Sequence, residues 1–238
     1  MKTEKKYNTK SFDFGKKKDF DRYRKFFVAD PYNRINEIKF QVLFCLLQPI
    51  LKGASILDLG CGEAFYADYL IKNGARHFLG IDRSPHMIEQ AKKDNFDKKK
   101  KEFITGDMLK VGLWQKSQYD IVLSIFSLMR VRSIKKLFKS VAVSTKKGGV
   151  FVIVTNAYEM DKNLAGKRFI VKIKKNSKIF LNNYPRPAHY FIREAASNGY
   201  KLAYLFSKPF SKDKKIIYPN PKNIKGFDMI LFFVKQKK

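Results

Sequence analysis

The chain has 238 residues, 45% of them hydrophobic, and a formal net charge of +29 at pH 7. This hydrophobic share is enough to bury one domain core. No apolar run approaches the roughly 18 residues of a membrane span, and the charged start MKTEKKYNTK lacks the apolar segment of a secretory signal. Two cysteines, Cys45 and Cys61, give no disulfide framework and no metal-ligand spacing. We therefore expect a protein without a membrane span or a metal ion, in the reducing cytoplasm.

The positive charge is unevenly distributed. Residues 26–96 hold 8 basic and 8 acidic residues, whereas residues 97–238 hold 32 basic and 9 acidic ones, a net charge of +23. One interpretation is attraction to an anionic partner, such as RNA, a phosphorylated metabolite or an acidic surface. The other is a lysine-rich background, because only 10 of the 50 basic residues are arginine, the residue that planar phosphate recognition favours. Both interpretations remain open.

The N-terminal part is expected to contain a flexible segment followed by helices. Residues 1–20 are polar and lysine-rich, and we expect them to be flexible. Residues 21–51 are predicted to be helical, since Ile35, Ile38 and further apolar positions up to Leu47 recur near a 3.6-residue period.

From residue 54 onward, apolar runs alternate with helical segments. The predicted strands are residues 56–59, 77–81, 102–106, 120–126 and 150–155, and the predicted helices are residues 63–73, 85–95 and 133–145. Ser84 and Pro85 are a favourable N-cap and first-turn pair. This alternation predicts a parallel, doubly wound α/β sheet.

The last third of the chain breaks the alternation. Residues 157–183 suggest a β-hairpin or an irregular insertion, and a helix is predicted at 187–198. Strands at 200–206 and 227–234 follow, joined by a proline-rich link at 209–221. Two late strands joined in this way should pair antiparallel at the sheet edge.

The most informative stretch is ASILDLGCGEAFYADYL, residues 54–70, in which a strand leads into Gly60-Cys61-Gly62. Glycines let the backbone approach a ligand closely, and a helix starting at Glu63 would direct its free N–H groups at an anion. The dinucleotide fingerprint requires a third glycine at position 65, which is Phe65 here, so that interpretation fails.

Three acidic residues narrow the choice of ligand. Asp58, two residues before the first glycine, suits a ligand with an ammonium group. Asp82 lies 20 residues beyond Gly62, where a carboxylate can accept hydrogen bonds from ribose hydroxyls. Asp107 and Met108 offer an acceptor for an exocyclic amine and an apolar face for a purine. An amino acid joined to an adenosine satisfies all three positions. The structural alternatives are a turn cap for Asp58, a helix N-cap for Asp82 and an ordinary turn for Asp107.

The chain resembles the class I S-adenosylmethionine-dependent methyltransferases over roughly residues 30–238. The matching blocks are ILDLGCGEAFY, LGIDRSPHMIEQAKK, FITGDML, YDIVLSIFSLMRV and KKGGVFVIVT. The resemblance implies an α/β, Rossmann-like, doubly wound and mostly parallel seven-stranded sheet, with an antiparallel edge strand and helices on both faces. It divides the single methyltransferase domain, residues 21–238, into N-terminal lid helices (21–51), a cofactor-binding core (54–155), a substrate-side insertion and helix (157–198) and C-terminal strands (200–238).

The resemblance also implies a cofactor and its ligands. The cofactor would be S-adenosyl-L-methionine and the product S-adenosyl-L-homocysteine. Asp58 would hold the methionine amino group, Asp82 the ribose, and Asp107 with Met108 the adenine. The full set of implied cofactor residues is Asp58, Gly60, Cys61, Gly62, Asp82, Arg83, Asp107, Met108, Ser124 and Phe126, with Ser84 as an alternative to Arg83 beside the adenine. One departure is Ala64, where the family usually has glycine; we expect tighter packing there with binding retained.

The acceptor site is less specific. The implied reaction is an in-line displacement in which the protein mainly orients the acceptor, and a base is needed only for an acceptor that keeps its proton until attack. Candidate bases are His189, Tyr184, Glu159 and Tyr190. For His189, the structural alternative is a hydrogen-bonded residue at a helix start. The candidate acceptor-binding residues are Tyr23, Tyr32, Asn33, Arg186 and Tyr190.

Three functions remain in competition. The first is transfer of a methyl group to N or O of a small molecule, including an anionic one, by a monomer or homodimer. The second is methylation of RNA, on a cap guanine or a tRNA base, supported by aromatics such as Phe169 and Phe180 within the basic half. The third is a methyltransferase fold used only for binding.

Overall fold

The computed structural model describes residues 13–27, 38–95, 99–113, 116, 118–159, 169–172, 180–184, 186–209, 215–218 and 225–237. Within these ranges, only the backbone is described for residues 26–27, 38–39, 158–159, 169–172, 180–182, 215–218 and 225–226.

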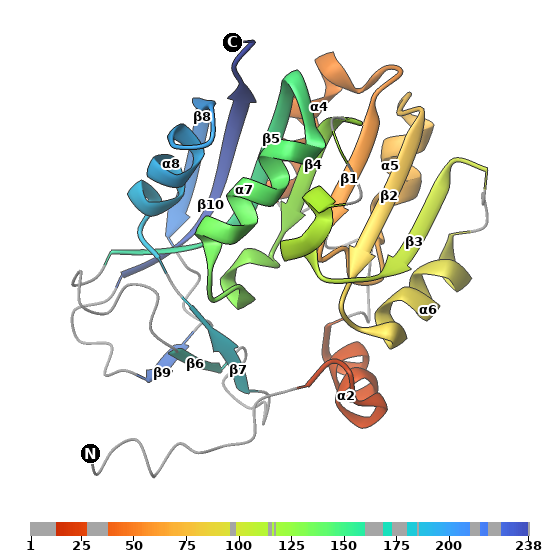
Figure 1. Cartoon of the computed structure of the whole chain (residues 1–238). Helices are drawn as coiled ribbons and strands as arrows, with labels where there is room; N and C mark the ends of the chain where they lie inside the picture. The colour runs from red at the N-terminus through yellow and green to blue at the C-terminus, as the bar shows by residue number, and fades with distance from the viewer. Residues whose placement is uncertain are drawn as a thin grey trace.

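A seven-stranded sheet forms the centre of the protein, in the order β3-β2-β1-β4-β5-β10-β8 (Figure 1). The first five strands in this order are parallel, and β10 pairs antiparallel with both β5 and β8. The strands are β1 (Ser55–Leu59), β2 (His77–Asp82), β3 (Lys101–Thr105), β4 (Tyr119–Ile125), β5 (Thr145–Glu159), β8 (Tyr200–Pro209) and β10 (Lys225–Lys235). The predicted mostly parallel sheet with antiparallel pairing of the late strands is confirmed.

Helices cover both faces of the sheet, as the alternation predicts. Successive strand side chains point to opposite faces, and in β1 all five residues are buried because each face is covered. Ile56 belongs to an apolar cluster that includes residues of α4 (Ile38–Leu51), α5 (Ala67–Lys72) and α6 (Pro85–Asp94). Leu57 belongs to the cluster on the other side, which includes residues of the 3₁₀ helix η1 (Met108–Leu113), α7 (Ile134–Ser144) and α8 (Ala188–Ala196). The protein therefore has two apolar layers, one on each side of the sheet.

Among the described residues of the N-terminal part, helices α2 (Lys17–Phe27) and α4 lie where residues 21–51 were predicted to be helical. Helix α2 begins inside the segment 1–20 that we expected to be flexible. Its Phe20 side chain is only 3% exposed and lies 5.7 Å from the His86 ring, between ring centroids. Burial of one apolar side chain against α6 thus fixes the position of a mostly polar helix.

A second, three-stranded sheet forms outside the main one, in the order β7-β6-β9. Strands β6 (Phe169–Lys172) and β7 (Phe180–Asn183) pair antiparallel, as the predicted hairpin requires. Strand β9 (Lys215–Tyr218) comes from the segment predicted as a proline-rich link, and it pairs antiparallel with β6. The small sheet and α2 both lie beyond the carboxyl ends of the parallel strands (Figure 1). In the part of the chain that the structure describes, no helix is long and apolar enough to cross a membrane.

Candidate active site

The loop after β1 turns back immediately onto β2. The backbone N–H groups of Gly60 and Cys61 both donate to the carbonyl oxygen of Ile81, at 2.7 and 3.0 Å, and the Gly62 N–H donates to Asp82 Oδ2 at 3.0 Å. Our expectation of a helix from Glu63 with N–H groups directed at an anion is wrong, because α5 begins only at Ala67. The first three N–H groups of the loop are already used within the protein, so this turn is not a phosphate cradle.

Backbone geometry explains both the glycines and the late helix start. Gly60 has a φ of 75°, and a Cβ placed on it would lie 2.4 Å from the Cβ of Ser127. Ala64 is fully buried and has a φ of 51°, a conformation that L residues adopt only at a cost. The departure from glycine at this position therefore places strain in the loop as well as the expected close packing.

Asp58 is the most deeply buried acid of the site. Its side chain is inaccessible to solvent, and its Oδ2 accepts a hydrogen bond from the Tyr66 hydroxyl at 2.5 Å. Among the described residues, no group bonds its other oxygen, Oδ1. Burial raises the pKa of Asp58 from 3.8 to about 7, the Tyr66 hydrogen bond opposes the rise, and the nearby Asp82 adds to it.

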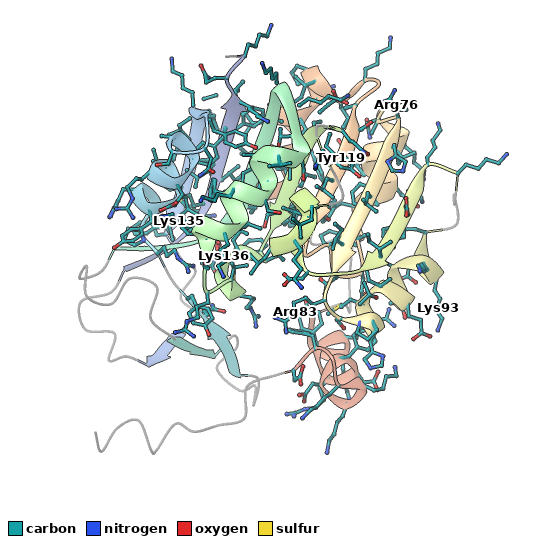
Figure 2. The ribbon with its side chains drawn as sticks, in the orientation of Figure 1. Arg76, Arg83, Lys93, Tyr119, Lys135 and Lys136 are labelled. Atoms are coloured by element: carbon teal, nitrogen blue, oxygen red, sulfur yellow. The ribbon has the colours of Figure 1, made fainter. Side chains whose placement is uncertain are left out.

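Asp82 ends β2 and holds the loop together. Its Oδ1 accepts from the backbone N–H of Ser84 at 2.8 Å, and its Oδ2 accepts from that of Gly62. Burial raises its pKa, and these backbone hydrogen bonds oppose the rise. A carboxylate has about four lone-pair positions, so each oxygen can accept one more hydrogen bond from a ligand. The neighbouring Arg83 is exposed at the same end of the sheet (Figure 2). The predicted N-cap of α6 is Ser84, whose Oγ accepts from the Met87 N–H at 3.3 Å.

The end of β3 approaches the glycine loop through Met108. The Met108 methyl carbon would lie 3.0 Å from a Cβ on Gly60, so these two predicted cofactor residues are neighbours in space. Asp107 directly precedes η1, and its Oδ1 accepts from the Leu109 N–H at 3.0 Å. Asp107 thus has the turn-forming role that was its structural alternative, while its other oxygen has no hydrogen bond recorded to the described residues.

The end of β4 is tied to the end of β1 by two serines. The hydroxyl oxygens of Ser124 and Ser127 lie 2.5 Å apart, and Ser127 donates to the Leu59 carbonyl oxygen at 2.6 Å. Between them, Phe126 has a φ of 53°, and its N–H donates to the Val154 carbonyl oxygen at 2.7 Å. Sequence reasoning selected Ser124 and Phe126 but missed Ser127, for which only its place three residues after Ser124 gave a signal.

Helix α2 and the residues before it contact the same loops. Arg24 forms an ion pair with Glu63 of the glycine loop, with 3.0 Å between Nε and Oε1. Ser84 Oγ donates to the Phe14 carbonyl oxygen at 2.5 Å, and the Arg130 guanidinium lies 5.3 Å from the centre of the Phe14 ring. The predicted acceptor residue Tyr23 meets the edge of that ring, with 5.2 Å between centroids. These long-range contacts leave no local pattern in the sequence.

Arg186, a predicted acceptor ligand, is only 4% exposed. Its guanidinium donates to the backbone carbonyl oxygens of Tyr184, Val131 and Arg132 at 2.7–2.8 Å. Burial lowers its pKa to about 10. It therefore joins the start of α8 to the turn after η2 (Leu128–Arg130). Tyr32 and Asn33 lie outside the described residues.

The candidate bases lie near the start of α8 and at the end of β5. His189 is exposed in the first turn of α8, with its ring 4.8 Å from that of Tyr190. The Arg193 guanidinium lies 4.8 Å from the centre of the same Tyr190 ring. The Tyr184 N–H donates to the Met129 carbonyl oxygen at 2.6 Å. Only the backbone of Glu159 is described, at the end of β5. Their catalytic roles stay predictions.

The strand order, the acid-flanked glycine loop and the acids ending β2 and following β3 define the class I methyltransferase architecture. A family model described as a methyltransferase domain matches residues 50–199. The chain belongs to this family, and with it to the class I S-adenosylmethionine-dependent methyltransferase superfamily, whose cofactor is S-adenosyl-L-methionine.

Curated relatives match only part of their length. An uncharacterized protein of Haemophilus influenzae is 38% identical over 87 residues, which is 37% of this chain and 34% of that protein. The ubiquinone biosynthesis O-methyltransferase of Pelagibacter ubique is 32% identical over 108 residues, which is 44% of this chain and 43% of that protein. The chain thus spans well under half the length of these relatives.

Solved structures share the fold over most of the chain. An S-adenosylmethionine-dependent methyltransferase from Mesorhizobium loti has a TM-score of 0.63 at 18% identity, covering 84% of this chain and 99% of that one. The magnesium protoporphyrin IX methyltransferase of Synechocystis has a TM-score of 0.62 at 16% identity, covering 94% and 97%. At these identities the likeness concerns the fold alone.

Proposed function

We propose that the protein is an S-adenosylmethionine-dependent methyltransferase that transfers a methyl group to a nitrogen or oxygen atom of a small-molecule acceptor. The observation that carries this proposal is the Oδ1 of Asp58, which is buried and bonded by none of the described residues. A buried polar atom without a partner is rare and costly. A carboxylate oxygen at the base of the loop fits the ammonium group of the cofactor's methionine moiety, and the residues present therefore suit this cofactor.

The remaining cofactor residues lie at different strand ends, and each would bind a different part of the ligand. Asp82 would accept the ribose hydroxyls with the lone pairs that its backbone bonds leave over. Met108 would offer its thioether to the adenine. Gly62, where a Cβ would meet nothing closer than 3.9 Å, leaves the loop open toward the ligand. The turn's use of its own N–H groups supports a ligand without phosphates.

Bound S-adenosyl-L-methionine supplies a methyl group that is already activated as a sulfonium. The work left to the chain is to bind, to exclude water and to orient the acceptor, which can be worth effective molarities of about 10⁵–10⁸ M. Tyr23 on α2 and Tyr190 on α8 would line the acceptor side, and His189 would take a proton from an acceptor that needs to lose one.

The family comparison gives no support to RNA as the acceptor. Lys135 and Lys136 do project from α7 (Figure 2), and Lys139 on the same helix is exposed. A helix face that carries only lysines is, however, what a lysine-rich composition produces by itself. RNA is therefore treated as an outcome of the test below rather than as a second proposal.

The test is a transfer screen with methyl-labelled cofactor against a metabolite pool and total RNA. The proposal predicts cofactor-dependent label in the small-molecule fraction, lost in the Asp82→Ala variant. Label in RNA, together with RNA binding that weakens with salt by a slope near −0.7 per phosphate contact, would replace the small-molecule acceptor by RNA. No labelled product in either fraction, with no binding of the cofactor, would contradict the proposed activity.

A further inference from the structure

Tyr66 is the only side chain that bonds the Asp58 carboxylate among the described residues, and the proposed function gives it no role. Its hydroxyl donates to Asp58 Oδ2 at 2.5 Å, and its side chain is 3% exposed. Its ring lies edge-on to the rings of Phe65 and Phe78, at centroid distances of 4.9 and 6.5 Å. Aromatic packing thus fixes the hydroxyl on one oxygen of the acid.

We propose that Tyr66 is a positioning residue for the cofactor's amino group: it occupies Oδ2 of Asp58, leaves Oδ1 for the ammonium, and makes cofactor capture dependent on pH. This inference rests on the proposed function, because it requires a ligand with an ammonium group. The bond constrains the carboxylate at the strand end, so that Oδ1 remains as its open position.

The electrostatics around Asp58 determine the direction of the pH dependence. The titratable groups that interact with it are Tyr66 before α5, Cys61 in the loop and Asp82 at the end of β2, and none of these three is a cation. Burial raises the pKa of Tyr66 well above its ordinary value, so the hydroxyl keeps its proton and remains the donor. Asp58, with a pKa of about 7, is then the group that changes charge near neutrality.

The proposal predicts that the ammonium enters well only when Asp58 is ionised. The affinity for an amino-bearing ligand should therefore rise as pH increases through about 7. A hydrogen bond from Tyr66 favours the ionised carboxylate. Removing the Tyr66 hydrogen bond should move the midpoint of the rise in affinity to higher pH. It should also weaken binding at pH 7 by about tenfold, as expected for loss of one hydrogen bond to a charged group.

The experiment is calorimetric titration of the wild type and Tyr66→Phe with S-adenosylhomocysteine between pH 6 and 8.5. Phenylalanine keeps the ring contacts, and the same titrations with 5′-methylthioadenosine, which lacks the amino acid, report on packing alone. Tyr69→Phe is the matched control, since Tyr69 lies three residues later and is 37% exposed. The expected result is a raised midpoint and weaker S-adenosylhomocysteine binding in Tyr66→Phe, with 5′-methylthioadenosine affinity unchanged and Tyr69→Phe like the wild type.

Two outcomes would overturn the inference while leaving the proposed function intact: an unshifted midpoint in Tyr66→Phe, or an equal loss of both ligands. If the wild type binds neither ligand, the proposed function itself fails. A double-mutant comparison keeps the test independent of the stability of one variant. In the Asp58→Asn background the pH dependence should disappear, and Tyr66→Phe should then have no further effect on discrimination between the two ligands. A pH midpoint that persists in Asp58→Asn would also overturn the inference.

Discussion

The cofactor region (residues 55–127) and the acceptor region (residues 180–200) hold their functional residues in different ways. In the cofactor region, the selected groups sit at the ends of buried parallel strands and are bonded to one another, as Asp58 is to Tyr66 and Asp82 is to Gly62. In the acceptor region, His189 is exposed, and Arg186 is engaged by backbone carbonyl oxygens. Parallel strands bring residues to one edge whatever the ligand is, whereas an acceptor site depends on added elements and on contacts between distant segments.

The largest expected effect is in the cofactor region, at Gly60. In Gly60→Ala the new Cβ would lie 2.4 Å from the Ser127 Cβ, and the alanine would have to adopt a φ of 75°. Positive φ costs about 1–2 kcal/mol and overpacking about 1–3 kcal/mol, so unfolding free energy should fall by about 3 kcal/mol. Gly53→Ala is the control, because Gly53 has a φ of 74° with nothing within 4 Å of its Cβ. Equal losses in urea denaturation of the two variants would show that the contact with Ser127 is unimportant.

The acceptor region should respond to Arg186→Met by losing stability without losing cofactor affinity. Removing the guanidinium leaves three carbonyl oxygens without this donor; the bond to Val131 is buried and the other two are partly buried. An unsatisfied buried group costs about 1–3 kcal/mol. We expect a loss of about 2–3 kcal/mol in unfolding free energy and S-adenosylhomocysteine affinity within about twofold of the wild type. The exposed Arg193→Met serves as control. A large loss of cofactor affinity would erase the distinction between the two regions.

In the absence of ligand, the buried Asp58 should lower the unfolding free energy of the protein at neutral and higher pH. Asp58 has a pKa of about 7 in the folded protein and an ordinary value of 3.8. Between these values the unfolded chain releases a proton that the folded protein keeps, so stability falls as pH rises, and above about 7 the loss is complete. Each pKa unit corresponds to about 1.4 kcal/mol.

Asp58→Asn cannot titrate and should escape this loss. The cost of its new buried amide donor is the same at both pH values, so between pH 4 and pH 8 the difference in unfolding free energy should shift in favour of the variant by about 4 kcal/mol. Denaturant unfolding of both ligand-free proteins at the two pH values measures this difference. A variant that is less stable than the wild type by the same amount at both values would contradict the raised pKa.

The smallest expected effect is at Ala64, where the strained loop should become more relaxed. A φ of 51° costs an alanine about 1 kcal/mol, and the greater freedom of glycine in the unfolded chain offsets part of that gain. Ala64→Gly should therefore raise unfolding free energy by about 0.5 kcal/mol, measured as a higher melting temperature. Ala67→Gly, in the first turn of α5, should act in the opposite direction. A destabilised Ala64→Gly would show that the methyl group's packing outweighs the strain.

Sequence reasoning recovered the parts of the fold that local patterns encode. Alternating apolar runs gave the parallel strands, and Ser84-Pro85 gave the start of α6 to the residue. It failed at α5, because a positive φ at Ala64 delays the helix to Ala67. It also missed β9, since the pairing of Lys215–Tyr218 with β6 joins segments more than 40 residues apart.

In the site, too, the residues that local patterns encode could be predicted, and those that depend on contacts between distant segments could not. Asp58, Asp82 and Met108 could be chosen from their places at strand ends, and the structure brings these strand ends together. Tyr66 and the Arg24–Glu63 ion pair act through geometry between elements, and no spacing in the sequence distinguishes them from ordinary residues. For Ser127 the only signal was its place three residues after Ser124. The acceptor-side residues had no periodic framework to place them.

The central claim is that Asp58 binds the cofactor's amino group, and calorimetry at pH 8 tests it most directly. Wild type, Asp58→Asn and the exposed-acid control Asp94→Asn would each be titrated with S-adenosylhomocysteine. Loss of one partner of a buried charge pair costs about 2–5 kcal/mol, so Asp58→Asn should bind at least about 30-fold more weakly, while Asp94→Asn binds like the wild type. Equal affinity of Asp58→Asn and the wild type would contradict the account.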